Sequence, residues 1–186
     1  MRVVSGFARG HKLICLEGDT VRPTSDRAKE AIFSSLEPLI RGVRFLDLFS
    51  GSGAIGIEAL SRGAAHVSFV ESEKRHVDII QKNLAHVLKT IPDANYKVIN
   101  KAALYALNDF GVSGLQFGII FMDPPYNSNL WEEALHLIYE RAILSENGIV
   151  MLEISKDERA PANPHFNIFK RKFYGRAAIY FMEINK

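Results

Sequence analysis

Residues 43–60 constrain the fold of this chain more than any other stretch. A short apolar run at 43–48 is followed by Gly51, Gly53 and Gly56, and residues 54–60 have the composition of a helix. Glycine lets a backbone turn sharply and lets a ligand approach it, and the first turn of a helix presents free N–H groups. The stretch therefore predicts a strand, a tight loop and a helix, either around a ligand or as a turn with glycines needed for packing.

Strands and helices are predicted to alternate through the rest of the central region. Strands are expected at 43–48, 66–70, 96–99, 117–122 and 149–154, and helices at 54–62, 73–89, 102–107 and 130–142. This alternation is typical of an α/β fold with right-handed crossovers and a largely parallel sheet. Residues 168–173 and 177–184 also resemble strands, but the gap between them is too short for a crossover. They should form an antiparallel hairpin.

The first 42 residues precede this pattern, and we expect an N-terminal extension (1–42) on a core (43–186) within a single domain. Residues 2–5 and 12–16 predict a small β-hairpin. A helix is expected after 24–26 and should end near Pro38 and Gly42. Lys29 falls off its apolar stripe, which has helical spacing and contains Ala28, Ala31, Ile32, Leu36 and Leu39.

Composition excludes several classes of protein. The chain has 186 residues, 47% of them hydrophobic, and Cys15 is its only cysteine, so no intramolecular disulfide is possible and a reducing compartment is consistent. No segment approaches the roughly 18 apolar residues of a membrane span. We expect a cytoplasmic monomer with no membrane partner. The net charge of +2 combines +3 in residues 1–44, −5 in 45–154 and +4 in 155–186, and basic ends suggest a polyanionic partner.

Two acids follow predicted strands and narrow the choice of ligand. The glycine pattern alone fits a dinucleotide, but the carboxylate of Asp47 beside the loop would repel a pyrophosphate. It would instead attract the ammonium and sulfonium groups of S-adenosylmethionine (SAM). Glu71 closes the next predicted strand, where an acid can accept hydrogen bonds from both hydroxyls of a ribose.

A second motif, Asp123-Pro124-Pro125-Tyr126, follows the almost wholly apolar strand predicted at 117–122. The carboxyl ends of parallel strands face the ligand crevice, so Asp123 should lie near the glycine loop. Two prolines withhold N–H donors and leave acceptors. Acceptors that hold the hydrogens of an exocyclic base amine can aim its lone pair at a methyl donor, while Tyr126 stacks on the base. A proline-stiffened loop with a capping acid is the alternative. We expect no metal, because the histidines lack ligand spacing and no Cys/His cluster exists.

The motifs resemble those of SAM-dependent amino-methyltransferases, and above all those of the RsmD family of bacterial 16S rRNA guanine-N2 methyltransferases. The resemblance spans nearly the whole chain and includes residues 22–27, 47–53, 58–64 and 123–126. It implies a seven-stranded, Rossmann-like methyltransferase sheet with an antiparallel last strand. It also implies methyl transfer from SAM to N2 of one guanine in the 16S rRNA of the small ribosomal subunit or its assembly intermediate.

The resemblance also implies roles for individual residues. Asp123, Pro124, Pro125 and Tyr126 would hold the guanine. The cofactor would be bound by Asp47, Phe49, Gly51, Ser52, Gly53, Glu71, Ser72, Ala102 and Asp123. Ala102 would act through its main chain, because residues 100–103 lack the usual acid or amide for the adenine. Independently of the resemblance, the charge of the N-terminal extension predicts that its basic residues bind RNA phosphates: Arg2, Arg9, Lys12, Arg22 and Arg27.

Other functions remain open at this point. A DNA adenine methyltransferase uses the same Asp-Pro-Pro-Tyr motif, although it normally needs an additional target-recognition region. A protein glutamine methyltransferase usually has Asn where Asp123 stands. A non-catalytic SAM-fold module would bind ribosomal RNA without needing these acceptors, and a nicotinamide oxidoreductase would leave Asp47 unexplained.

Overall fold

The structure is a computed structural model that describes residues 1–15, 26–91, 93–125 and 128–185. The predicted seven-stranded α/β architecture is confirmed within these ranges. The strands are β1 (Arg44–Asp47), β2 (His66–Glu71), β3 (Tyr96–Asn100), β4 (Phe117–Met122), β5 (Leu144–Ser155), β6 (Phe166–Tyr174) and β7 (Ala177–Ile184). The helices are α1 (Asp26–Ser34), α2 (Glu37–Ile40), α3 (Ala54–Ser61), α4 (Lys74–Val87), α5 (Ala103–Ser113) and α6 (Leu130–Glu140).

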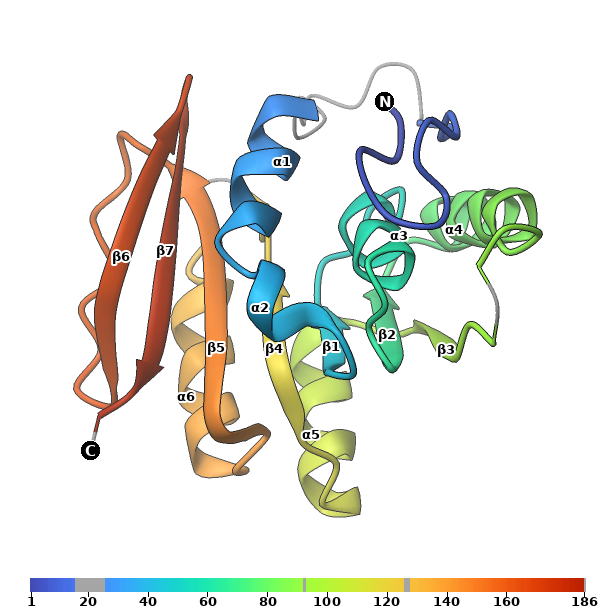
Figure 1. The fold of residues 1–186 in the computed structure, drawn as a ribbon. Helices are drawn as coiled ribbons and strands as arrows, with labels where there is room; N and C mark the ends of the chain where they lie inside the picture. Colours follow the sequence, from blue (N-terminus) through green and yellow to red (C-terminus); the bar gives the residue numbers. More distant parts are fainter. Residues whose placement is uncertain (16–25, 92, 126–127, 186) are drawn as a thin grey trace.

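The strand order is β3-β2-β1-β4-β5-β7-β6 (Figure 1), so the first strand lies in the middle of the sheet. β2 and β3 are added on one side of it, and β4 to β7 on the other. β1 to β5 are mutually parallel, whereas β7 pairs antiparallel with both β5 and β6. The predicted C-terminal hairpin and antiparallel last strand are therefore confirmed. The order reverses between β1 and β4, and ligands of such sheets bind outside the carboxyl ends of the strands at this point.

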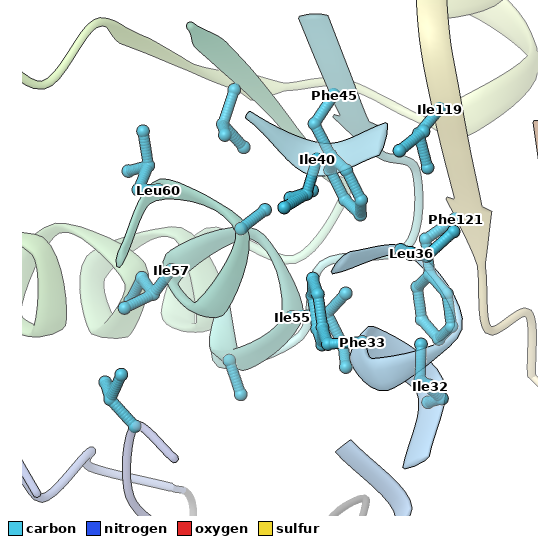
Figure 2. Close-up of a cluster of buried hydrophobic side chains, with 14 of the residues drawn as sticks. Ile32, Phe33, Leu36, Ile40, Phe45, Ile55, Ile57, Leu60, Ile119 and Phe121 are labelled. Atoms are coloured by element: carbon cyan, nitrogen blue, oxygen red, sulfur yellow. The ribbon is translucent and has the colours of Figure 1, made fainter. Parts of the chain in front are cut away.

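Helices cover both faces of the sheet, which explains why its central strand is apolar. Side chains alternate along β4: Ile119 and Phe121 join a core cluster with the helices on the α1 and α3 side, and Ile120 and Met122 join a second cluster with α5 and α6. Figure 2 shows the first cluster, where α1 and α2 lie against α3 and the central strands. The alternation also fixes which face each strand-end acid points to.

The N-terminal extension corrects one prediction. Residues 2–5 and 12–15 do not form strands, because in the described part of this segment the pairing is limited to an isolated antiparallel bridge between Arg2 and Lys12. The N–H groups of Val4 and Ser5 donate instead to the carboxylate of Glu58 on α3, at 2.8 and 2.9 Å. A charged acceptor offers stronger hydrogen bonds than a strand partner, so the extension is anchored to α3.

The helical part of the extension also differs from the prediction. Pro38 lies in the first turn of α2, where its missing N–H is not needed, so it begins a helix rather than ending one. Ile32 and Leu36 of the predicted stripe are buried, but Leu39 is 48% exposed. Phe33 and Lys29 are fully buried instead. The helix breaks between Ser34 and Glu37, and this break changes which residues face the core.

Lys29 is buried because α1 packs on α3 through an ion pair. Its ammonium lies 3.8 Å from the carboxylate of Glu58 and donates a hydrogen bond to the carbonyl of Arg2. Arg62 donates to the other oxygen of Glu58 at 2.9 Å. Burial lowers the pKa of Lys29, and the nearby Glu58 opposes that effect. Removing one partner of such a pair is strongly destabilising, so these charges fix the extension to the core.

Candidate active site

The glycine loop joins β1 to α3, and its glycines have two different purposes. Gly51 and Gly53 have positive φ angles of 51° and 78°, which residues with a side chain rarely adopt. Gly53 is the N-cap of α3, where its carbonyl accepts a 2.9 Å hydrogen bond from the N–H of Ile57. Gly56 lies inside α3, and a Cβ there would meet the ring of Phe69 at 2.3 Å. The third glycine thus serves helix–strand packing.

Asp47 ends β1 directly beneath this helix start. Its side chain is almost fully buried, and Oδ2 accepts a 2.9 Å hydrogen bond from the N–H of Gly56. Burial raises the pKa of Asp47 to about 7; the bond from Gly56 opposes this rise, and the charges of Asp123 and Glu71 add to it. A cationic group bound nearby would favour the ionised carboxylate, so this acid is suited to a positively charged ligand.

Glu71 connects the glycine loop to the loop that follows β2. Its Oε2 accepts from the N–H of Gly51 at 2.8 Å, and its Oε1 accepts from the N–H of Glu73 at 2.9 Å. Ser72 Oγ lies 3.4 Å from Oε1. The carboxylate therefore holds two loops at the sheet edge, and Oε2, which accepts the hydrogen bond from Gly51, has a second lone pair that a ligand hydroxyl can use.

Asn83 on α4 supports the same loop and was missed by the sequence analysis. Its Nδ2 donates to the carbonyls of Ser52 and Ile14, at 2.9 and 3.0 Å, and its Oδ1 accepts from the N–H of Ile14 at 2.8 Å. The side chain is buried beside Leu84. An amide beside the apolar stripe of a helix was the available signal, because a buried polar group needs hydrogen-bond partners.

A pocket of about 170 Å³ opens beside Glu71 at the carboxyl edge of β1, β2 and β3. Asn100, the last residue of β3, donates to the carbonyls of Glu71 and Ser72 at 2.9 and 2.8 Å and thereby shapes one wall. The pocket brings together four of the predicted cofactor residues. Its lining includes Phe49, Glu71, Ser72, Ala102, Pro125 and Leu130.

Asp123 follows β4 at the same edge, as the sequence predicts. Its burial raises the pKa of the carboxyl group to about 7. Pro124 after it is buried and Pro125 is exposed, while Tyr126 lies outside the described residues. Asp47 and Asp123 project from neighbouring strands on the face covered by α1 and α3, because each follows a residue that packs in the cluster with α5 and α6.

The basic residues predicted to contact RNA are only partly brought together. Arg2, Arg9 and Lys12 are all exposed on the N-terminal extension, next to Phe7, which is 55% exposed. The Arg2 guanidinium is paired with Asp26 at 2.9 Å, so Arg9 and Lys12 are the freer charges of this group. Arg22 lies outside the described residues, as does the side chain of Arg27.

The chain is similar to known proteins over most of its length. The family described as "Conserved hypothetical protein 95" matches residues 1–183. Ribosomal RNA small subunit methyltransferase D of Haemophilus influenzae is 36% identical over 94% of this chain and 89% of its own length. The protein of the same name from Escherichia coli K12 is 33% identical over 96% of this chain and 87% of its own.

The chain is also similar to solved structures over nearly its whole length. The structure described as a putative methyltransferase, yhhF, from Escherichia coli has a TM-score of 0.86 and 33% identity, and the match covers 99% of this chain and 97% of that one. None of the helices in the described part of the chain could span a lipid bilayer. The chain therefore belongs to the family described as Conserved hypothetical protein 95, which is the RsmD family that the sequence motifs resemble.

Proposed function

We propose that this protein is a SAM-dependent methyltransferase that modifies the exocyclic N2 of a guanine in 16S rRNA of the small ribosomal subunit. The observation that carries the proposal is the convergence of Asp47, Glu71 and Asp123 at the carboxyl edge of three strands. The relatives named ribosomal RNA small subunit methyltransferase D support rRNA as the substrate.

The residues at this edge fit SAM. Three carboxylates suit a ligand with two positive charges, and the pocket beside Glu71 has the apolar walls that an adenine ring needs. We infer that Asp47 and the loop of Gly51, Ser52 and Gly53 bind the methionine end, and that Glu71 binds the ribose. Phe49, Ser72 and the main chain of Ala102 would line the adenine side. When bound, SAM supplies an electrophilic methyl group.

The chain's own contribution to the transfer is to position the base and accept a proton. Asp123 accepts a hydrogen bond from the guanine amine, and the carbonyl of Pro124 provides a second acceptor. These contacts orient the nitrogen lone pair and stabilise the positive charge that develops on it. The nitrogen then loses a proton, which the carboxylate of Asp123 takes up; a pKa of about 7 is well matched to that role.

The target base must leave its stack for its N2 amine to reach Asp123, which is half-buried at the sheet edge. Tyr126 is proposed to stack on the base, and Arg9 and Lys12 to bind phosphates nearby. The extension holds these basic groups in place through Glu58, which links RNA binding to the catalytic core.

Replacing Asp123 with alanine tests the proposal. Small subunits from cells that lack this protein are incubated with labelled SAM, and the methylated nucleotide is mapped in the rRNA. We expect Asp123→Ala to keep SAM binding largely intact, through Asp47 and Glu71, and to lose transfer, whereas Asp157→Ala, which removes an exposed acid, keeps full activity. Wild-type turnover by Asp123→Ala, or methylation of DNA adenine instead of rRNA guanine, would contradict the proposal.

A further inference from the structure

Glu153 on β5 is a buried acid to which no role has been assigned. Its side chain is 6% exposed. One of its oxygens, Oε2, is fully buried and has no hydrogen-bond partner among the residues that the structure describes. Because most buried polar atoms are hydrogen-bonded, an unpaired carboxylate oxygen in a core strand needs an explanation.

The sheet register places Glu153 beside Asp123. Met122 of β4 pairs with Leu152 of β5, so the residue after each stands in the next row toward the carboxyl edge. Leu152 and Ile154 pack on the α5 and α6 side, which directs Glu153 to the opposite face, where Asp123 also projects. Neighbouring strands lie about 4.8 Å apart, so two carboxylates on adjacent strands can contact one small planar ligand.

Within its row of the sheet, Glu153 has an acid on one side, Asp123, and an apolar residue on the other. Its partner across the antiparallel pair with β7 is Ile179, which is fully buried. Burial raises the pKa of Glu153 to about 8, and the charge of Asp123 contributes to the rise. A buried acid beside a second acid is costly unless a ligand brings hydrogen-bond donors.

From this juxtaposition, and resting on the proposed function, we propose that Glu153 recognises the target guanine by accepting a hydrogen bond from N1–H while Asp123 holds the N2 amine. Guanine carries two adjacent donors, N1–H and N2–H, on its pairing edge. At a pH above the pKa of Glu153, where the side chain is ionised and both oxygens are acceptors, adenine presents an acceptor at N1 that faces an oxygen with no donor between them. Paired carboxylates thus favour guanine, and Glu153 is a specificity-determining residue.

The test compares guanine with 2-aminopurine, which keeps the exocyclic amine but has an acceptor in place of N1–H. Each base is placed at the mapped position of 16S rRNA by ligation, and the rRNA is assembled into small subunits. Methylation is measured at a pH above the pKa of Glu153, so that the wild-type side chain is an acceptor. We expect the wild type to methylate guanine roughly 10- to 100-fold more efficiently than 2-aminopurine, as for a lost base-edge contact. Glu153→Gln, whose amide can donate to an N1 acceptor, should narrow that ratio by about tenfold. Glu183→Gln, the same change at an exposed position of β7, should leave the ratio unchanged.

The outcomes separate this inference from the proposed function. Equal methylation of both bases by the wild type overturns the role of Glu153 and leaves the methyltransferase intact, even if Glu153→Gln does not fold. A folded Glu153→Gln with an unchanged ratio has the same meaning. No methylation of guanine in assembled subunits overturns the proposed function itself.

Discussion

Replacing Asp47 by asparagine separates the effect of this buried acid on the free energy of unfolding from its contribution to SAM binding. The amide keeps the size of the side chain, and its carbonyl can still accept the hydrogen bond from Gly56. It cannot ionise. The pKa of about 7 in the folded protein, against an ordinary value of 3.8, corresponds to about 4 kcal/mol at a pH above both values.

The sign of the effect on stability follows from proton binding. Between pH 3.8 and about 7 the unfolded chain ionises Asp47 and the folded chain does not. The folded state therefore binds more protons, and this group makes the wild type less stable as the pH rises through that window. Asp47→Asn lacks this contribution, so at about pH 8 the unliganded variant should be more stable than the wild type, by up to about 4 kcal/mol.

The same ionisation should govern SAM binding. If the cation requires the ionised carboxylate, the wild-type affinity falls by about tenfold for each pH unit below 7, because one proton is released on binding. Asp47→Asn should bind weakly at every pH, without the part of this dependence that Asp47 causes.

Two measurements test this pair of expectations. Urea unfolding at several pH values gives the stabilities, and calorimetric titration with SAM between about pH 5 and pH 7.5 gives the affinities. Asp157→Asn, at an exposed acid, is the matched control. An affinity that does not change with pH, or an Asp47→Asn variant as pH-dependent as the wild type, would refute the reasoning about Asp47.

Three further predictions concern the supports of the site. Gly56→Ala should lower the free energy of unfolding by about 1–3 kcal/mol, because its Cβ meets an aromatic ring on β2, and chemical denaturation measures this; unchanged stability would show that the ring moves aside freely. Asn83→Leu should weaken SAM binding and lower the free energy of unfolding by about 1–3 kcal/mol, because main-chain groups of two loops lose their hydrogen-bond partner. A wild-type affinity for SAM in calorimetry would show that Asn83 does not support the SAM site. Replacing Arg9 and Lys12 together by alanine should reduce the slope of log affinity for RNA against log salt concentration by about 1.4–1.8; a slope equal to that of Lys89→Ala, an exposed control, would remove the two residues from the RNA interface.

The sequence predicted the sheet well because its signals are local. Apolar runs that end in Asp47, Glu71 and Asp123 mark both the strands and the edge at which the acids meet. The short gap at 174–176 was enough to predict the antiparallel hairpin. These features depend on residues close together in the chain, and the structure confirms them.

What the sequence analysis missed depends on contacts between distant segments. Glu58 looks like an ordinary helical residue, yet its carboxylate binds main-chain N–H groups more than 50 positions earlier, which cancels the predicted strands. Lys29 is buried for the same reason. Glu153 interrupts an apolar run, and that interruption was a readable signal of its burial. The contacts of the predicted residues with SAM and RNA stay predictions.

The hydrogen bonds of α1 have a consequence for the order in which the protein matures. Lys170 and Lys172 on β6 donate to Ser35 Oγ and to the carbonyl of Ala31, across separations of 135 and 141 positions. During synthesis, α1 leaves the ribosome long before the strand that anchors it. Closing so long a loop is slow, so we expect the packing of α1 against β6 to form last, and a nascent chain that lacks β6 to hold α1 without these two hydrogen bonds.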